Sequence, residues 1–182
     1  MRLVVLDRDG VINHESEAYI KSPDEWIPIP GSLEAIARLN QGGFNVVVAT
    51  NQAGVGRGLF DLAALTEIHA KMTASLAKVG GHLDGIFFCP HRPEENCGCR
   101  KPAPGLFQQI AERFHISLSG APVIGDSLRD IEAAETVGAR PILVRTGYGE
   151  EALRQLIDQS RAEVFANLAQ VVDYLIKQGK HM

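Results

Sequence analysis

The sequence predicts an α/β protein, a three-layer sandwich in which helices cover a central, mostly parallel sheet of Rossmann type. Three observations lead to this prediction. Strand-like and helix-like stretches alternate along the 182 residues. The strand-like stretches are short and apolar, as in strands buried on both faces. Most of them end at polar residues, which is typical of parallel strands whose carboxyl ends face a ligand.

The first quarter of the chain predicts one strand and one helix, separated by a long loop. Residues 3–6 form an apolar run that stops at Asp7, and we expect a buried strand there. Residues 13–30 have no periodicity and contain three prolines, so they should form a loop or short hairpin near the site. A helix capped by Ser32 should extend to about residue 41, where two glycines follow.

The next segment predicts a strand, a long helix and another strand. Residues 44–49 form the second apolar run, and polar residues follow it. Asp61 should open a helix that two glycines close. We interpret His69, on this helix, as a surface or packing residue rather than a ligand. A third strand is expected at residues 85–88. The apolar positions of the helix recur every three or four residues, at Leu62, Leu65, Ile68, Met72, Leu76 and Val79.

The remaining elements continue the alternation. A loop is expected at residues 89–99. The elements expected after it are a helix at 105–114, a strand at 122–124, a short helix, a strand at 141–144 and a helix at about 168–177.

The polar residues beyond the expected strands suit phosphoryl transfer. Paired carboxylates need a cation between them, Mg²⁺ prefers such oxygen ligands, and a hydroxyl and an ammonium group can hold phosphate oxygens. Each residue alone could equally be a helix cap or a surface charge, but together they should meet at one edge of the sheet. They are Asp7, Asp9, Thr50, Lys101, Asp126 and Asp130.

Four ordered motifs resemble those of the haloacid dehalogenase superfamily of phosphatases, and they span nearly the whole chain. The resemblance implies the sheet order 5-4-1-2-3, with the Asp7 strand central. The spacing of the motifs leaves no room for a large cap domain, so the site should be open. The motifs are Asp7-Arg8-Asp9-Gly10, Val48-Ala49-Thr50-Asn51, Lys101-Pro102 and Gly125-Asp126-Ser127-Leu128-Arg129-Asp130.

The same resemblance implies a role for each residue. Asp7 would be the nucleophile that forms an aspartyl-phosphate, and Asp9 the general acid and then base. Thr50 and Lys101 would bind the transferring phosphoryl group. Mg²⁺ would be held by Asp7, by Asp9 through its backbone carbonyl, and by Asp126. Asp130 would lie behind these ligands.

All three cysteines fall in the loop at residues 89–99, together with one histidine. Cys89, His91, Cys97 and Cys99 supply four ligands of the kind that structural Zn²⁺ takes. A disulfide or free thiols are the alternatives, although three cysteines leave one unpaired and the composition favours a reducing compartment. A structural zinc here would fix the cations that follow directly in the chain.

Within the superfamily, this cysteine loop resembles that of the D-glycero-D-manno-heptose 1,7-bisphosphate 7-phosphatases and of the related histidinol-phosphate phosphatases. The residues after the second strand look more like the heptose enzymes. We therefore expect hydrolysis of the C7 phosphate of the bisphosphate, with histidinol phosphate as the alternative substrate. Arg57 and Arg100 would hold the second phosphate, and Asn51 and Gln52 would bind sugar hydroxyls. The sequence does not predict the anomer.

Composition sets the remaining expectations. A net charge of −4 provides no basic face for nucleic acid. No apolar run is long enough to span a membrane, and the first one is broken too early for a signal peptide. We expect a single domain at 1–179 that is cytoplasmic and monomeric, and we set residues 180–182 aside as a cloning remnant. Two other classes stay open: a non-catalytic phosphoacceptor module, against which Asp9 argues, and a zinc-stabilised interaction protein.

Overall fold

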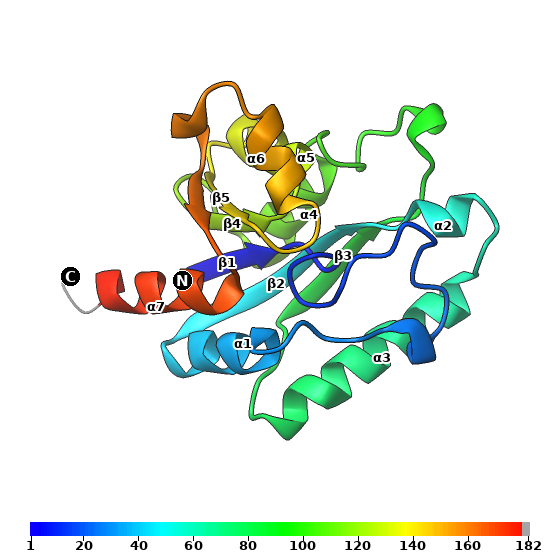
Figure 1. The fold of residues 1–182 in the computed structure, drawn as a ribbon, viewed down its shortest axis with the longest axis horizontal. Coiled ribbons are helices and arrows are strands. Elements are labelled where there is room, and N and C mark those ends of the chain that lie inside the picture. Colours follow the sequence, from blue (N-terminus) through cyan, green and yellow to red (C-terminus); the bar gives the residue numbers. More distant parts are fainter. Residues whose placement is uncertain (180–182) are drawn as a thin grey trace.

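The computed structural model describes residues 1–179, so the interpretation of residues 180–182 lies outside the described part. The centre of the fold is a six-stranded sheet in which every neighbouring pair of strands is parallel. Its order is β3-β2-β1-β4-β5-β6 (Figure 1). The strands are β1 (Arg2–Leu6), β2 (Phe44–Asn51), β3 (Gly85–Cys89), β4 (Pro122–Gly125), β5 (Arg140–Val144) and β6 (Glu163–Phe165).

Helices cover both faces of this sheet, which confirms the predicted three-layer α/β fold (Figure 1). One layer contains α1, α3 and α7, and the other contains α4, α5 and α6. The helices are α1 (Ser32–Gln41), α2 (Ala53–Gly56), α3 (Leu62–Lys78), α4 (Gly105–Phe114), α5 (Leu128–Thr136), α6 (Gly149–Gln155) and α7 (Leu168–Gly179). No helix among residues 1–179 is long and apolar enough to cross a membrane.

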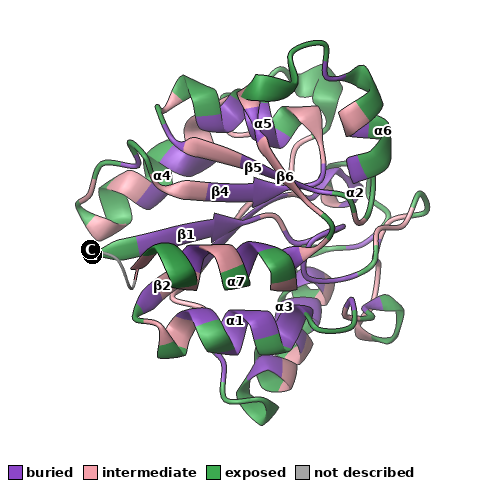
Figure 2. Cartoon of the chain, turned by 60° about the vertical axis from the view of Figure 1, so that its left-hand side comes forward, coloured by how far each residue is buried: buried purple, intermediate pink, exposed green. Residues whose placement is uncertain are grey.

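The central strands β1 and β2 alternate their side chains between the hydrophobic cores on the two faces of the sheet, and β1 is buried over most of its length (Figure 2). Val4 and Leu6 of β1 pack under α1, α3 and α7, whereas Leu3 and Val5 pack under α4 and α5. This alternation is the two-residue period of a strand. Because both faces are covered, β1 is apolar from Leu3 to Leu6 after the exposed Arg2, and the polar residues of the site begin where the strand ends.

The structure corrects the cap of α1. Ser32 was predicted as the N-cap, but Gly31 occupies that position with a φ of 86°. Ser32 is already helical and buried, and its hydroxyl donates to the carbonyl of Val11 at 2.8 Å. The serine therefore ties the helix to the segment that follows Asp9.

Two further differences concern element boundaries. Leu62 and Val79, expected on the apolar face of α3, are 53% and 36% exposed because they lie at the two ends of the helix. The strand β6 and the helix α6 were not predicted. The strand order inherited from the resemblance is otherwise confirmed, with β6 added beyond β5.

The loop between β1 and α1 is held against α3. Trp26 is buried, and Lys71 of α3 donates to the carbonyls of Pro23 and Trp26 at 2.6 and 3.0 Å. The contact with Trp26 satisfies a carbonyl that has no backbone partner within residues 1–179, and the contact with Pro23 adds to the hydrogen bond that its carbonyl accepts from the N–H of Trp26. They fix the loop beside the carboxyl ends of β1 and β2.

Candidate active site

Asp7 is the first residue after β1, at the centre of the sheet. Its Oδ1 accepts the backbone N–H of Arg8 at 2.7 Å and lies 3.1 Å from Nζ of Lys101. Both contacts involve the same oxygen, so Oδ2 keeps its lone pairs free of hydrogen bonds from residues 1–179. A carboxylate held by one oxygen and free at the other has the geometry of a positioned nucleophile.

Asp9 lies beside Asp7 and contacts a different set of groups. Its Oδ1 accepts from the side chains of Arg8 and Asn13, and its Oδ2 accepts from Nε2 of Gln52 at 2.9 Å. The carboxylate therefore does not turn towards the other acidic residues. No backbone N–H within residues 1–179 donates to the carbonyl oxygen of Asp9, which leaves that oxygen available to a cation.

Lys101 is buried between two carboxylates. Its Nζ donates to Oδ1 of Asp130 and to the carbonyl of Ala49, both at 2.6 Å, in addition to the contact with Asp7. Burial works to lower the pKa of Lys101, but the charges of Asp130 and Asp7 outweigh it, so this pKa is raised. The ammonium group stays charged and neutralises part of the acidic cluster.

Asn51, at the end of β2, holds the backbone of Lys101 on both sides. Its amide nitrogen donates to the carbonyl of Lys101, and its amide oxygen accepts the N–H of the same residue, each at 3.0 Å. This pair of hydrogen bonds joins two motifs that lie 50 residues apart. It favours a positioning role for Asn51.

Asp126 follows β4 and is enclosed by two glycines. A Cβ on Gly10 would lie 1.9 Å from Oδ2 of Asp126, and one on Gly147 would lie 2.1 Å from the same oxygen. Both glycines also have positive φ, which side chains rarely adopt. The backbone N–H of Tyr148 donates to this oxygen at 2.8 Å. The backbone of Gly10 and of Gly147 therefore packs directly against the carboxylate of Asp126, with no space for a side chain at either position.

The acidic cluster contains more negative charge than Lys101 can neutralise. Burial raises the pKa of Asp7 to about 7 and that of Asp126 to about 9. Oxygens of Asp7, Asp126 and Asp130 lie within 4.8 Å of one another. Three carboxylates in so small a volume match the all-oxygen ligands of Mg²⁺. Asp130 is less available, because Lys101 and Ser127 already bind its two oxygens.

Thr50 and Gln52 lie at the end of β2, opposite Asp9. Both are buried, and Nε2 of Gln52 donates to Oγ1 of Thr50 and to Asp9, each at 2.9 Å. The hydroxyl hydrogen of Thr50 can still donate to a phosphate oxygen. Gln52 was predicted to bind sugar hydroxyls, but its contacts favour a role in orienting Asp9.

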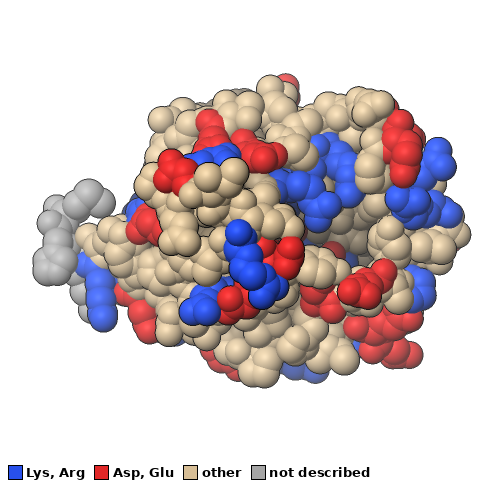
Figure 3. Space-filling model, turned by 45° about the horizontal axis from the view of Figure 1, so that its top comes forward, with Lys and Arg blue, Asp and Glu red and all other residues tan. Residues whose placement is uncertain are grey.

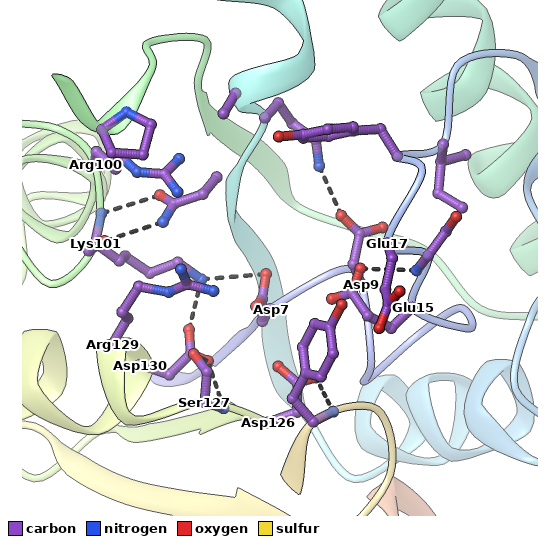
Figure 4. Close-up of a pocket in the computed structure, with 18 of the residues that line it drawn as sticks. Asp7, Asp9, Glu15, Glu17, Arg100, Lys101, Asp126, Ser127, Arg129 and Asp130 are labelled. Carbon is purple, nitrogen blue, oxygen red and sulfur yellow. Dashed lines mark hydrogen bonds and ion pairs between the residues drawn. The ribbon is translucent and has the colours of Figure 1, made fainter. Parts of the chain in front are cut away.

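The acidic residues, Lys101, Asn51 and Gln52 line an open cavity of about 220 Å³, and Thr50 lies buried behind this lining. Figure 3 shows a hollow with Lys and Arg gathered along its upper border and Asp and Glu along its lower border. In the close-up, Arg100, Lys101 and Arg129 face Glu15 and Glu17 across the cavity, with Asp7 between them (Figure 4). The cavity thus has a cationic wall and an acidic wall.

The cationic wall contains charge without a protein partner. Nη1 of Arg100 is buried and has no hydrogen-bond partner within residues 1–179. Burial and the charge of Arg129 lower the pKa of Arg100. Two guanidinium groups that repel each other beside a cavity form a site suited to an anion. Arg57 also lines the cavity, but it is exposed and contacts Glu94 at 3.4 Å.

The cysteine loop forms one compact cluster. Sγ atoms of Cys89, Cys97 and Cys99 lie 3.0 to 3.6 Å apart, and Nδ1 of His91 lies 3.2 Å from Sγ of Cys99. Four ligand atoms gathered this closely can reach one ion, and a tetrahedron around Zn²⁺, with edges of roughly 3.5–4 Å when Zn–S is about 2.3 Å, needs the shortest of these separations to widen by about half an ångström or more. The N–H of Arg100 donates to Sγ of Cys97 at 3.4 Å, so the cluster is tied to the cationic wall.

Several cavity residues were not identified from the sequence. Glu15 and Tyr19 come from the unpatterned loop after β1, and Tyr148 comes from the unpredicted start of α6. Arg129 was quoted within a motif, without a role. Position 129 directly follows the start of α5 at the edge of the sheet, and this placement could have indicated it. Glu15 had no such signal.

The fold and the arrangement of Asp7, Asp9, Lys101 and Asp126 define an enzyme of the phosphoryl-transfer class. Comparisons with known proteins identify its family. A family model described as HAD-hydrolase-like matches residues 98–171, and one described as polynucleotide kinase 3 phosphatase matches residues 3–127. The chain belongs to the haloacid dehalogenase-like hydrolases.

Curated relatives share the whole length of the chain. A D-glycero-β-D-manno-heptose-1,7-bisphosphate 7-phosphatase of Bordetella bronchiseptica is 52% identical, over 98% of this chain and 100% of the relative. The enzyme of the same name from Pseudomonas putida is 49% identical, over 97% of this chain and 100% of its own length. The crystal structure of the D,D-heptose 1,7-bisphosphate phosphatase from B. bronchiseptica, complexed with magnesium and phosphate, has a TM-score of 0.95, covering 98% of this chain and 99% of that one.

Proposed function

We propose that this chain is a Mg²⁺-dependent phosphatase that hydrolyses the C7 phosphate of D-glycero-β-D-manno-heptose 1,7-bisphosphate, releasing heptose 1-phosphate and inorganic phosphate. The observation that carries the proposal is the Oδ2 of Asp7, free of hydrogen bonds from residues 1–179, beside Asp9 in a cavity that Arg100 and Arg129 also line. The full-length relatives named for this substrate support it. They also favour the β anomer, which the sequence left open.

The chemistry follows from the positions of the two aspartates. Asp7 attacks phosphorus and forms an aspartyl-phosphate, while Asp9 gives a proton to the leaving C7 oxygen. Asp9 then takes a proton from water, which attacks phosphorus and releases phosphate. Thr50 donates to the phosphoryl oxygens, and Lys101 places a positive charge beside them. The acid function of Asp9 separates this proposal from a phosphoacceptor module, which has no leaving group to protonate.

Magnesium would be held by Asp7, by the backbone carbonyl of Asp9 and by Asp126, with Asp130 behind them. When bound, the ion supplies positive charge to the phosphoryl oxygens and screens their repulsion from Asp7. The raised pKa values of Asp7 and Asp126 support this assignment, because a divalent cation removes the cost of keeping both buried groups charged.

The second phosphate should bind at the cationic wall. Arg100 has a buried nitrogen without a hydrogen-bond partner within residues 1–179, and Arg129 lies on the same wall of the cavity. Arg57 remains a further candidate at the rim. The acidic wall, with Glu15, can accept hydrogen bonds from sugar hydroxyls. A bisphosphate uses both walls, whereas histidinol phosphate would bring a cationic amine towards the arginines.

We expect Arg100→Ala to lower kcat/KM for the bisphosphate roughly 100-fold, since a charge-assisted hydrogen bond to phosphate contributes about 1.5–3 kcal/mol. For a monophosphate ester such as 4-nitrophenyl phosphate, the change should stay within about threefold, because no distal phosphate is lost. Arg113→Ala, a change at an exposed arginine of α4, is the matched control. Equal losses for both substrates would show that Arg100 does not bind the second phosphate.

Comparison of two substrates tests the proposal as a whole. The purified protein should show a higher kcat/KM for heptose 1,7-bisphosphate than for histidinol phosphate, in Mg²⁺ and at one pH. A preference for histidinol phosphate would assign the chain to that activity instead. Absence of turnover with both esters and with 4-nitrophenyl phosphate would leave the non-catalytic interaction protein.

We also propose that Cys89, His91, Cys97 and Cys99 hold a structural Zn²⁺, since four protein ligands leave no open position for water. Three thiols in a metal-ligand arrangement suit a reducing compartment. A cytoplasmic location and a monomeric state, without nucleic-acid or membrane partners, remain part of the proposal.

Metal analysis of protein purified without chelator should therefore find close to one zinc per chain. Cys97→Ala or Cys99→Ala should release the metal and lower the Tm, because a structural zinc contributes directly to folding. The KM for the bisphosphate should rise as well, since Arg100 loses its tie to Cys97. Zinc-free protein with unchanged Tm and KM would contradict this role.

A further inference from the structure

The second residue of the first motif, Arg8, is fully buried although it carries a charge. Its Nε and Nη2 donate to Oδ1 of Asp9 at 3.0 and 2.8 Å, and its Nη1 lies 3.1 Å from Nε2 of His69. The guanidinium group therefore connects the carboxylate of Asp9 to a histidine on α3, 61 residues further along the chain. The reaction described above uses neither Arg8 nor His69.

These contacts make the two oxygens of Asp9 unequal. Oδ1 accepts three hydrogen bonds, two from Arg8 and one from Nδ2 of Asn13 at 2.8 Å. Oδ2 accepts only one from the side chains of residues 1–179, from Gln52. An oxygen with three donors around it has no room for a proton, whereas Oδ2 can carry one and still accept from Gln52. The geometry thus distinguishes the oxygen that is held from the oxygen that reacts.

His69 can support Arg8 only as a neutral ring. Arg8 has no acceptor atom, so Nε2 of His69 must be unprotonated to receive its hydrogen. Burial, followed by the charge of Arg8, lowers the pKa of His69 to about 4. The ring also packs 6.2 Å from that of Phe88 on β3. His69 is therefore a fixed acceptor on a rigid helix, anchored on the side of Arg8 that faces away from Asp9.

We propose that His69 and Arg8 are positioning residues that fix the carboxylate of Asp9 so that Oδ2 delivers and receives the proton. The proposal rests on the phosphatase function above. In the first step, the proton on Oδ2 passes to the leaving oxygen as its bond to phosphorus breaks and the bond from Asp7 to phosphorus forms. In the second step, water attacks phosphorus, its proton passes to Oδ2, and the bond to Asp7 breaks.

A residue that positions a general acid has a distinctive signature in its dependence on the leaving group. A sugar alkoxide is a poor leaving group and needs the proton, whereas 4-nitrophenolate leaves without one. The parameter kcat/KM reports the steps up to formation of the aspartyl-phosphate, so it isolates the step in which Asp9 acts as an acid. A merely structural defect would lower kcat/KM for both esters alike.

The experiment compares kcat/KM for heptose 1,7-bisphosphate, phenyl phosphate and 4-nitrophenyl phosphate in wild type and in His69→Leu, which has no acceptor for Arg8. We expect a loss of at least roughly tenfold for the bisphosphate and less than about twofold for 4-nitrophenyl phosphate, since general acids contribute ~10²–10⁴-fold and misplacement forfeits part of that. Phenyl phosphate should fall between them. His69→Gln, whose amide oxygen can accept from Arg8, should recover most of the loss.

Arg8→Lys provides an independent variant, because lysine can reach Asp9 but cannot also contact His69. It should show the same dependence on the leaving group. Thr66→Ala, at an exposed position of α3, controls for general effects on the helix. Equal losses for all three esters, or no loss in either variant with the Tm retained, would overturn the proposal. Because the aryl esters do not depend on sugar recognition, they still test it if the bisphosphate proves not to be a substrate.

Discussion

Replacing Asp7 with asparagine should abolish turnover and leave the fold intact. An amide is neither a nucleophile towards phosphorus nor an anionic ligand for Mg²⁺, so one change removes both functions. The expected loss in kcat is at least ~10⁴-fold, comparable to removal of a nucleophile in other covalent mechanisms. Initial rates with 4-nitrophenyl phosphate and with the bisphosphate measure it. Residual activity within about 100-fold of wild type would contradict the aspartyl-phosphate mechanism.

The same variant should not lose stability in metal-free protein. Burial raises the pKa of Asp7 to about 7, so the folded protein binds a proton that the unfolded chain, with its ordinary carboxyl pKa, has already released. Stability from this group therefore falls as the pH rises from about 4 to about 7. Asparagine removes that dependence, and thermal unfolding at pH 8 should give a Tm equal to or above that of wild type. Asp24→Asn, at an exposed aspartate, is the control.

The second large effect is expected for Lys101→Met. Lys101 is 2% exposed and forms ion pairs with two carboxylates, the buried Asp130 and the partly buried Asp7. Removing one partner of a buried ionic group leaves uncompensated charge and typically costs about 3–5 kcal/mol. The variant should therefore unfold at a markedly lower denaturant concentration in metal-free buffer. It should also be inactive, because no positive charge remains beside the phosphoryl group.

A double variant separates these two consequences. Lys101→Met combined with Asp130→Asn removes one of the stranded charges, so it should recover part of the lost stability without recovering activity. Denaturant titrations of wild type, the two single variants and the double variant give the coupling free energy between Lys101 and Asp130. If Lys101→Met kept the wild-type unfolding midpoint and the wild-type kcat/KM, the ion pairs of Lys101 would contribute neither to the stability of the fold nor to catalysis.

The sheet and the acidic edge could be predicted because their determinants are local. A short apolar run ending in a carboxylate identifies a buried strand and the point where it ends, as at Asp7 and Asp126. The cysteine cluster was equally accessible, since all four ligands lie within eleven residues. In contrast, β6 has only three residues, and it depends on pairing with β5 for its formation.

The sequence could not predict which polar atoms remain free. Asn51 and Gln52 lie at the end of β2 and look available to a substrate, yet they hold Lys101 and Asp9. His69 has the spacing of a packing residue on α3, and it is one, but its contact with Arg8 depends on the placement of the loop after β1. Such contacts join residues 43 to 61 positions apart, and only the folded chain brings them together.

The central claim is that the C7 phosphate of the bisphosphate is removed and the anomeric phosphate is kept. Phosphorus NMR of D-glycero-β-D-manno-heptose 1,7-bisphosphate, incubated with the enzyme and Mg²⁺, tests this directly. We expect the primary phosphate resonance to be replaced by inorganic phosphate while the anomeric resonance persists, and EDTA to stop the conversion until Mg²⁺ is restored. Loss of the anomeric resonance, or conversion that continues in EDTA, would contradict the account.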